Sequence, residues 1–341
     1  MAARRVRLDD VAAAVGVSPA SVSLVLRGAP GPSAEMRTRV LEAAQRLGYR
    51  ADRTASLLAS RRSRLIGLLV DVRSPFHADV AAHLQDAAEA RGYDLVLSTV
   101  TRSRGEDRAV ETLLDSRCEA LVLIGPDAPA SRLGELAATL PLVVLCRRLA
   151  GLPGSGSADV VRTADEAGTA LAVEHLHRHG HTAIAYVDGG PGTVAEDRRE
   201  GYLQAMAERG LAARVLPGSG TPPGTETIGI RAAEALLDGA DLPTAVVAFN
   251  DRTAVGLLDT LARRGVDVPG EVSVVGYDDD PLSRMAHVDL TTVGQDTAGL
   301  AGRAVEAVVA RLDGDHETAG PEQVLAPYLA VRRTTGPARP S

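Results

Sequence analysis

Short apolar runs that suit β-strands alternate with helical patterns over most of this 341-residue chain. One set of runs lies at 65–70, 95–97, 120–124 and 142–145, and a second set lies at 184–187, 245–249 and 272–277. Helical patterns such as 78–91 separate neighbouring runs. Strands that alternate with helices form parallel sheets with right-handed crossovers. The sequence therefore predicts an α/β body of two lobes, each built on a doubly wound parallel sheet.

Two short helical patterns around a glycine precede this body. Apolar residues recur at helical spacing in both: Leu8, Val11, Ala12 and Val15 in the first, and Val22, Val25 and Leu26 in the second. Gly16 suits the end of the first helix, and Ser18 and Pro19 suit the start of the next. A third helix is predicted, with Ser33 as its cap and an apolar stripe of Val40, Leu41, Ala44 and Leu47.

This arrangement predicts an all-α helix-turn-helix domain, whose second helix enters the major groove of DNA. The alternative is a plain helical hairpin inside a larger core. That alternative fits less well, because the unit is N-terminal, self-contained and basic.

Charge is divided unevenly along the chain. Residues 1–62 contain eleven Arg and five Asp or Glu, a net charge of +6; because the whole chain carries −7, residues 63–341 carry −13. A basic segment on an acidic body indicates a polyanionic partner for that segment, although a solvated charged face gives the same asymmetry. Every basic residue is Arg, which excludes lysine-dependent phosphate loops and lysine Schiff bases.

Composition indicates a globular protein with aliphatic cores. The chain is 45% hydrophobic and 24% charged, with two Phe, six Tyr and no Trp. It has neither an apolar run long enough to span a membrane nor an apolar leader stretch. Cys118 and Cys146 lie in apolar, strand-like runs and are expected to be buried free thiols. We therefore expect a cytoplasmic protein with no membrane partner.

A series of longer motifs carries a family resemblance. It begins with LDDVAAAVGVSPASVSLVLRG, VLEAAQRLGYR, and TASLLA followed by LIGLLV, and continues with AVEHLHRHGHTAIAYVDG, DRREGYLQAM, TAVVAFNDRTAVGLL, VPGEVSVVGYDDDPL and LTTVGQD. In order and spacing these motifs resemble the lactose-repressor (LacI/GalR) family of bacterial transcription regulators. The resemblance implies a ligand-responsive, sequence-specific repressor with a two-lobed, periplasmic-binding-protein-like effector domain. It also implies three partners: double-stranded operator DNA, a second copy of the chain, and a small polar effector such as a sugar.

The resemblance also implies the domain boundaries. They are a helix-turn-helix domain at 1–50, a hinge helix and linker at 51–62, and an effector-binding and dimerisation domain at 63–341. Within the last, the N-lobe is expected at about 63–161 and 294–320, and the C-lobe at about 163–291 and 322–333. The chain would cross between the lobes near Val161–Thr163, Thr291–Gly294 and Gly320–Val324.

DNA contacts are expected mainly from the second helix. Ser18, Ser21 and Ser23 are candidate hydrogen-bonding residues, Arg27 is a candidate for the DNA backbone, and Ser33 lies at the start of the third helix. Pro19, Ala20 and Leu24 occupy positions that read bases in relatives. Position 24 is often Arg in the family; Leu24 is restricted to apolar contacts such as a thymine methyl, which leaves the operator sequence open.

The segment Asp52–Ser60 resembles the family's hinge helix, which wedges leucines into the minor groove of DNA. Leu57 and Leu58 match that wedge. Ala51 stands where relatives often have Pro, and Ser56 where they often have Arg. The alternative for the two leucines is simple packing onto the body.

The effector site is expected beyond the carboxyl ends of the strands, between the two lobes. Its candidate residues are Ser74, Phe76, Arg147, Arg198, Asn250, Asp278 and Gln295. Arginine, amide and carboxylate groups suit a polyhydroxylated ligand, and a purine would also fit. Asp278 as a turn or cap residue and Asn250 as an Asx turn are the alternatives. Arg147 and Arg148 stand where many relatives have an acidic residue; either one facing the cleft favours an anionic effector, and both facing solvent does not.

Other motifs lead to no chemistry. The histidines of HLHRHGH lack the zinc-protease pattern, so we predict neither a metal, a cofactor nor a catalytic site. The chain's end, VRRTTGPARPS, offers no heptad repeat for a tetramer. We expect a homodimer, with helix 78–91 (Ala78, Ala81, Ala82 and Gln85) a candidate contact face. The alternative functions are a solute-binding protein with no DNA role and an enzyme with a regulatory head.

Overall fold

The computed structural model of the protein describes residues 6–26, 29–49, 62–149, 158–218, 225–239, 241–314 and 322–339. The chain divides into two compact units, Met1–Ser63 and Arg64–Ser341, here called the head and the body. Among the described residues no single helix is long and apolar enough to cross a membrane. One bent pair of helices in the head meets that test only when the two are taken together, by length and composition.

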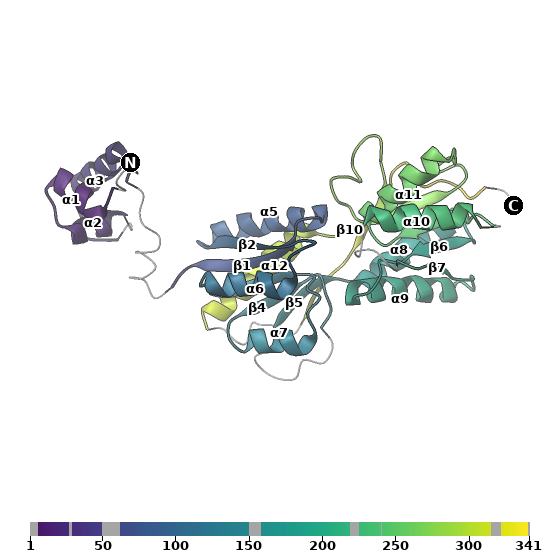
Figure 1. The fold of residues 1–341 in the computed structure, drawn as a ribbon, viewed down its shortest axis with the longest axis horizontal. Helices are drawn as coiled ribbons and strands as arrows, with labels where there is room; N and C mark the ends of the chain where they lie inside the picture. The colour runs from purple at the N-terminus through teal and green to yellow at the C-terminus, as the bar shows by residue number, and fades with distance from the viewer. Residues whose placement is uncertain are drawn as a thin grey trace. The chain divides into compact units, whose positions relative to one another are not determined.

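The head contains the three predicted helices, α1 (Leu8–Val15), α2 (Pro19–Leu26) and α3 (Ala34–Leu47), as Figure 1 shows. Gly16 ends α1 with a φ of 73°, a backbone conformation that favours glycine. The hydroxyl of Ser18 accepts a hydrogen bond from the Ser21 amide at 3.2 Å, so it caps α2 as predicted. The hydroxyl of Ser33 caps α3 in the same way, through the Met36 amide.

The buried face of α3 differs from the predicted stripe. Val40 and Ala44 are buried as expected, and Ala43 joins them, but Leu41 and Leu47 are 53% and 37% exposed. The core of the head consists mainly of valine and alanine, which allow these short helices to approach closely. The two leucines lie outside this narrow contact, so the prediction that they are core residues is wrong.

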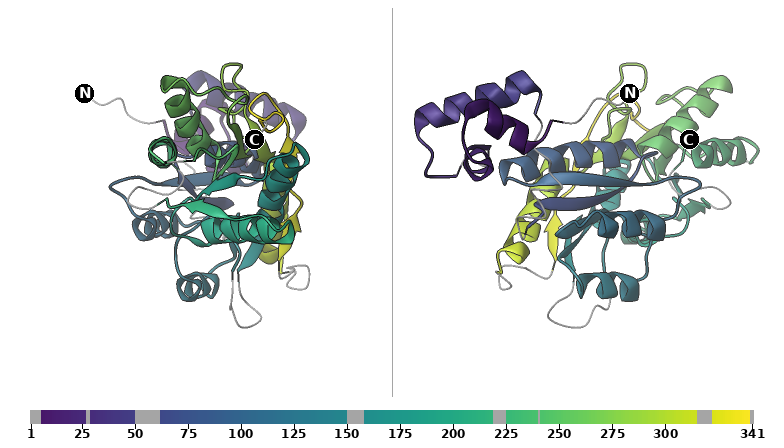
Figure 2. Two further views of the ribbon diagram at one scale, coloured as in Figure 1. Left: turned by 90° about the vertical axis from the view of Figure 1, so that its right-hand side faces the viewer. Right: turned by 60° about the vertical axis from the view of Figure 1, so that its left-hand side comes forward.

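The first lobe of the body is built on a six-stranded sheet of order β11-β5-β4-β3-β1-β2. Its strands are all paired in parallel: β1 (Leu65–Asp71), β2 (Asp94–Val100), β3 (Ala120–Ile124), β4 (Leu142–Leu145), β5 (Asp159–Thr163) and β11 (Gln323–Leu325). Helices α5 (Pro75–Ala90) and α12 (Thr297–Leu312) cover one face, and α6 (Glu106–Asp115) and α7 (Ala130–Ala137) cover the other. Figure 2 shows α12, in yellow, beside the blue strands of this lobe, although the two are distant in sequence.

The second lobe repeats this architecture with the order β12-β10-β9-β8-β6-β7. Its strands are β6 (Ile184–Val187), β7 (Arg214–Leu216), β8 (Ala245–Ala248), β9 (Ser273–Asp278), β10 (Thr291–Gly294) and β12 (Tyr328–Ala330), the last antiparallel to β10. Helices α8 (Asp165–Arg178) and α9 (Thr193–Glu208) cover one face, and α10 (Glu226–Leu237) and α11 (Asp251–Arg263) cover the other. The two doubly wound sheets predicted from the sequence are confirmed.

Alternating strand residues produce the two cores of each lobe. In β1, Leu68 packs toward α5 and α12, and the next residue, Leu69, packs toward α6 and α7. In β6, Tyr186 and Val187 divide in the same way between the α8–α9 face and the α10–α11 face. Strands buried on both sides explain why they read as continuous apolar runs.

The chain passes between the lobes after β5, after β10 and after β11. The first two passages follow Thr163 and Gly294, at the ends of the predicted segments. The third was expected at Gly320–Val324 and is displaced, because Val324 pairs with Arg162 in the first sheet and the chain leaves that sheet only after Leu325. Residues 322–325 therefore belong to the first lobe, not to the C-lobe as expected.

Candidate functional site

A cavity of about 450 Å³ lies between the two lobes, beyond the carboxyl ends of their strands. All seven side chains selected from the sequence line it: Ser74, Phe76, Arg147, Arg198, Asn250, Asp278 and Gln295. The first three come from the first lobe, the next three come from the second lobe, and Gln295 follows β10 at a passage between them. The topology thus brings together residues that are far apart in the sequence.

Arg198, on α9, is the central cation of this cavity and is only 4% exposed. Its Nε donates to Asp165 at 2.8 Å, its Nη1 donates to the carbonyl of Phe249 at 2.8 Å, and its Nη2 donates to Asp278 at 3.2 Å. The guanidinium also lies 3.6 Å from the centre of the Tyr277 ring, a cation–π contact. These contacts fix the guanidinium before any ligand arrives.

Asp278 ends β9 and faces Arg198. Its Oδ1 also accepts a hydrogen bond from the Gln295 amide at 2.9 Å. Burial raises the pKa of Asp278 to about 7, because desolvation of the carboxylate outweighs the attraction of Arg198. Its φ of 113° is a strained backbone conformation for a non-glycine residue, and such strain is often found at functional sites.

Ser74 and Asn250 each cap a helix and also line the cavity. The Ser74 hydroxyl accepts from the His77 amide at 3.3 Å at the start of α5, and the Asn250 side-chain oxygen accepts from the Thr253 amide at 2.9 Å at the start of α11. Asn250 therefore lines the cavity and also caps a helix, whereas the alternative interpretation was an Asx turn.

The first lobe adds a neutral histidine and an ion pair beside Phe76. His77 accepts a hydrogen bond from the Asp71 amide through Nδ1, and burial lowers its pKa to about 4. Arg73 pairs with the Asp71 carboxylate at 2.6 Å. None of these three was selected from the sequence, although all follow the first strand and so occupy the place where ligand contacts are expected.

Arg147 and Arg148 have different surroundings. Arg147 lines the cavity, and its Nη1 donates to the carbonyls of Pro126 and Ala128. Arg148 instead pairs with Asp197 of the second lobe at 2.6 Å, a contact that joins the two lobes. The structure therefore distinguishes the two arginines that the sequence left equivalent.

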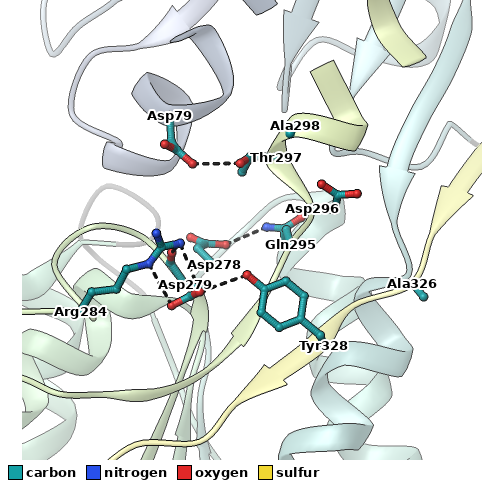
Figure 3. Close-up of a pocket in the computed structure, with 10 residues that line it drawn as sticks. All are labelled: Asp79, Asp278, Asp279, Arg284, Gln295, Asp296, Thr297, Ala298, Ala326 and Tyr328. Atoms are coloured by element: carbon teal, nitrogen blue, oxygen red, sulfur yellow. Dashed lines mark hydrogen bonds and ion pairs between the residues drawn. The ribbon is translucent and has the colours of Figure 1, made fainter. Parts of the chain in front are cut away.

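A second cavity, of about 400 Å³, lies beside the passages between the lobes (Figure 3). Asp278 and Gln295 line both cavities, so this hydrogen-bonded pair forms part of the wall between them. Thr297 donates to Asp79 at 2.9 Å on the first-lobe side, and Tyr328 donates to Asp279 at 3.0 Å on the second-lobe side.

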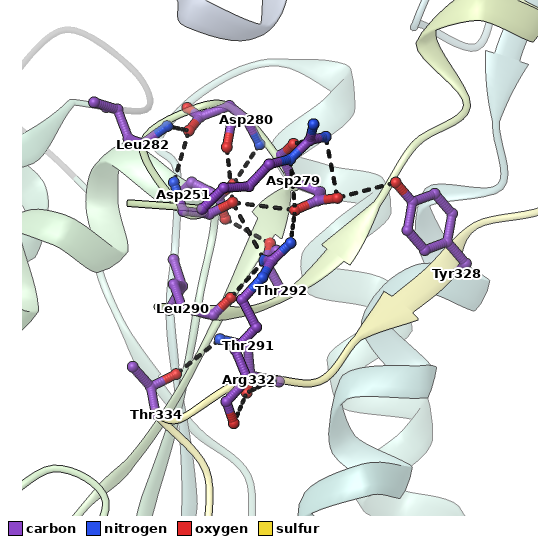
Figure 4. A network of polar contacts seen from close by, with 12 residues as sticks. Asp251, Asp279, Asp280, Leu282, Leu290, Thr291, Thr292, Tyr328, Arg332 and Thr334 are labelled. Atoms are coloured by element: carbon purple, nitrogen blue, oxygen red, sulfur yellow. Dashed lines mark hydrogen bonds and ion pairs between the residues drawn. The ribbon is translucent and has the colours of Figure 1, made fainter. Parts of the chain in front are cut away.

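A polar network in the second lobe shares Asp279 and Tyr328 with the lining of this second cavity (Figure 4). Arg332 pairs with Asp279 at 2.6 Å and donates to the carbonyl of Leu290 at 2.7 Å. Asp251 accepts from the Thr292 hydroxyl at 2.5 Å and from the Asp280 amide at 2.8 Å, and burial raises its pKa well above the usual range. The network ties the β9–β10 loop to the segment that follows the last strand, β12.

The sequence analysis missed the buried partners behind the cavity surface. Asp165, which begins α8, holds Arg198 and is 2% exposed, and Asp197 holds Arg148 and is 1% exposed. Asp165 follows β5, so the rule that polar residues after strands line the site would have found it. Asp197 lies inside a helix and has no comparable signal.

Metal ligation has no geometric basis in the described parts of the chain, where no group of three His, Cys, Asp or Glu side chains has a suitable arrangement. His175 bonds the Thr335 hydroxyl, and His181 bonds Thr244 and the carbonyl of Gly336. These histidines hold the C-terminal segment against the second lobe.

In the head, most of the residues expected to contact DNA lie at the start of α2 or along it. Ser18, Pro19 and Ala20 are exposed, Ser21, Ser23 and Leu24 are partly exposed, and Val22 and Val25 are buried between them. The Ser33 hydroxyl already accepts a hydrogen bond from the Met36 amide as the cap of α3. Arg27, Leu57 and Leu58, and the whole expected hinge helix, lie outside the described residues.

Comparison with known proteins gives matches to both units. Residues 7–52 match the bacterial regulatory proteins of the lacI family, and residues 173–335 match the periplasmic binding protein-like domain. The HTH-type transcriptional regulator GalR of Escherichia coli (strain K12) is 35% identical over 310 residues, which are 90% of this chain and 89% of GalR.

Two solved structures extend the similarity. The lac repressor dimer bound to operator and the anti-inducer ONPF is 27% identical, with a TM-score of 0.82 and coverage of 98% of this chain and 100% of that one. The complex of the transcriptional regulator CelR with cellobiose is also 27% identical, with a TM-score of 0.69 and coverage of 97% and 100%. The similarity thus spans both units of the chain.

Proposed function

This chain belongs to the lacI family of bacterial regulatory proteins, and from that premise we propose that it is a homodimeric repressor of transcription controlled by a small polar effector. The observation that carries the proposal is the polar cavity between the lobes, which lies in one chain with a helix-turn-helix head. We further propose that it acts in the cytoplasm and as a binding protein, not an enzyme.

The cavity chemistry supports a sugar or sugar derivative as the effector. Arg198 supplies fixed donors, Asp278 supplies acceptors, and the Gln295 and Asn250 amides supply further polar contacts. Such groups match ligands with several hydroxyls. Phe76 offers an apolar surface on the opposite side. The structure of CelR with cellobiose gives a precedent for a sugar in a related regulator.

The surface of α2 supports double-stranded DNA as the partner of the head. Ser18, Pro19 and Ala20 are small and exposed, which allows the helix to lie close to the floor of a major groove. The basic charge of the head favours contact with phosphates. We propose that Ser18, Ser21, Ser23 and Ser33 contact the backbone or bases, that Pro19, Ala20 and Leu24 meet base edges, and that Arg27, Leu57 and Leu58 contribute beyond the described residues.

Control would act through closure of the two lobes. An effector held by Arg198 on one side and Phe76 on the other would draw the two lobes together, and the Arg148–Asp197 ion pair already joins them. Coupling between sites is reciprocal, so operator DNA must change effector affinity by the same factor as the effector changes DNA affinity. The lac repressor dimer on operator supports a dimer here, and the outward Ala78 and Ala82 of α5 remain a candidate contact face.

Fluorescence anisotropy with full-length protein and with residues 64–341 tests this function. A duplex selected from a random pool by the full chain should bind that chain tightly, with affinity falling steeply as salt rises, because neutralised phosphates release counterions. The body alone should not bind the duplex, whereas both proteins should bind the same effector in calorimetry. Tight binding of the duplex by the body, or no selected duplex for the full chain, would contradict the proposal.

A further inference from the structure

Arg147 differs from the other arginines of the effector cavity in having no carboxylate partner among the described residues. Of the residues that the structure describes, four arginines line that cavity: Arg73, Arg147, Arg198 and Arg252. Three of them form ion pairs at 2.6 to 2.8 Å, Arg73 with Asp71, Arg198 with Asp165 and Arg252 with Glu226. No carboxylate of the described residues pairs with Arg147, whose acceptors are backbone carbonyls.

The backbone holds the Arg147 guanidinium in one orientation. Cys146, with a φ of 59°, turns the chain after β4, and both N–H groups of Arg147 Nη1 are then used by the carbonyls of Pro126 and Ala128. Glu106 holds the same loop from the other side, accepting from the amides of Asp127 and Ala128 at 2.7 and 3.1 Å. The loop and the guanidinium therefore fix each other.

This arrangement leaves one end of the guanidinium available. Nε is buried, and neither Nε nor Nη2 has an acceptor among the described residues. An arginine donates but does not accept, so only an acceptor can satisfy Nη2. Glu106, the acidic group that interacts electrostatically with Arg147, already uses both its oxygens on the loop amides.

A helix N-terminus adds to the positive potential of the cavity. Gly192, Thr193 and Val194 line the cavity at the start of α9, and Gly192 provides no side-chain cap. The first amides of a helix carry partial positive charge and suit an anionic oxygen. This feature supports the argument from Arg147 and does not replace it.

We propose that the effector carries an anionic group, a carboxylate or a phosphate, and that Arg147 is the specificity-determining residue that binds it through Nη2. The inference rests on the proposed effector function of the cavity. Arg198 and Asp278 then hold the hydroxyl-bearing part of the ligand, and Arg147 selects its charged end. The ligand class is an acidic sugar derivative, not a neutral sugar.

Calorimetry with matched neutral and anionic ligands tests the proposal on the full-length chain. The probes are galactose with galacturonate, and glucose with gluconate and glucose 6-phosphate. We expect an anionic member to bind at least about tenfold more tightly than its neutral counterpart, because charge-assisted hydrogen bonds are about twice as strong as neutral ones. The carboxylate and phosphate probes distinguish the two sources of charge.

Three variants assign the preference to Arg147. Arg147→Gln should reduce the ratio of anionic to neutral affinity to near one, whereas Arg132→Gln, which changes an exposed arginine of the same lobe outside the cavity, should leave the ratio unchanged. Arg147→Lys keeps a charge and a donor for the loop but lacks the fork, so it should fold and lower the ratio partly.

Two results would overturn the proposal: a panel in which only neutral ligands or none bind, and a preference for the anion that survives in Arg147→Gln. Anisotropy on the selected duplex is measured in parallel. If the unmodified chain binds no duplex, the repressor function is refuted. The ratio of anionic to neutral ligand affinity still tests the role of Arg147 in that case.

Discussion

The two walls of the effector cavity differ in how their charged side chains are bonded. On the second-lobe wall, formed by Arg198, Asn250 and Asp278, the charged groups already bond one another or a buried partner. On the first-lobe wall, which includes Ser74, Phe76 and Arg147, the Arg147 guanidinium is held by backbone carbonyls and pairs with no carboxylate of the described residues, and Phe76 is apolar. The first arrangement is a preformed anchor, and the second leaves donors for a ligand to satisfy.

Because of this difference, we expect one wall to contribute mainly to the affinity for the ligand and the other mainly to the choice of ligand. A network whose members are mutually satisfied keeps its geometry without a ligand, so it lowers the entropic cost of binding any ligand that fits. A wall that leaves a donor for the ligand, as Arg147 does, can determine which ligand fits. We therefore expect substitutions on the second-lobe wall to affect stability and affinity together, and those on the first-lobe wall to affect mainly selectivity.

Arg198→Ala tests the comparison with the largest expected effect. It removes the cation that compensates Asp165 and Asp278, both buried, and loss of one partner from a buried pair typically costs about 3–5 kcal/mol. We expect a decrease of that size in the free energy of unfolding, measured by urea denaturation, together with loss of effector binding. The head should still bind DNA where the variant remains folded.

Arg73→Ala is the matched control on the other wall. Its side chain is 29% exposed and pairs with an equally exposed carboxylate, so it should cost no more than about 1 kcal/mol. Similar losses in the two variants would mean that the second-lobe wall is no more preformed than the first.

The sequence predicts the residues that line this cavity better than the buried residues that hold them in place. Asp278, Asn250 and Ser74 follow strands or begin helices, and the shared edge of a parallel sheet brings such positions together by topology. Asp197 lies within α9, near its start, where nothing local indicates that it meets Arg148 across the lobes. Its role depends on tertiary contact, which periodicity does not encode.

Helix α3 of the head and the third passage between the lobes, after β11, show the same limit of local sequence patterns. The spacing of apolar residues located α3, but only the packing of three short helices decides that Ala43 is buried and Leu41 is exposed. Val324 belongs to the first sheet because it pairs with Arg162, a partner far away in the chain. Local patterns determine the elements, and long-range pairing determines their boundaries.

The pH dependence of the free energy of unfolding compares one buried titratable group on each wall. The expected change is smaller than that of Arg198→Ala. Burial raises the pKa of Asp278 from 3.8 to about 7, so between these values the native state binds the proton more tightly than the unfolded chain does. Stability from this group is therefore lost as pH rises toward 7. On the opposite wall, His77 has a pKa lowered from 6.5 to about 4, so its contribution is lost as pH falls through that window.

The variant Asp278→Asn removes the first of these titrations. The free energy of unfolding of the variant minus that of the unmodified protein should increase by roughly 2 kcal/mol between pH 5 and pH 7, because one unit of pKa corresponds to about 1.4 kcal/mol. Urea denaturation at each pH measures this difference. The variant His77→Gln should change the slope in the opposite direction, and equal slopes in all three proteins would show that neither wall titrates as described.

The smallest expected effects come from the helix caps on the two walls. Ser74 and Asn250 both cap a helix and both face the cavity, so Ser74→Ala and Asn250→Ala should each cost about 1 kcal/mol of stability. If the second-lobe wall anchors the ligand, Asn250→Ala should also weaken effector binding beyond its effect on stability, whereas Ser74→Ala should change affinity little. Calorimetry with each variant, beside thermal unfolding, separates the two effects. The reverse order of affinity losses would place the anchor on α5 and overturn the assignment of the walls.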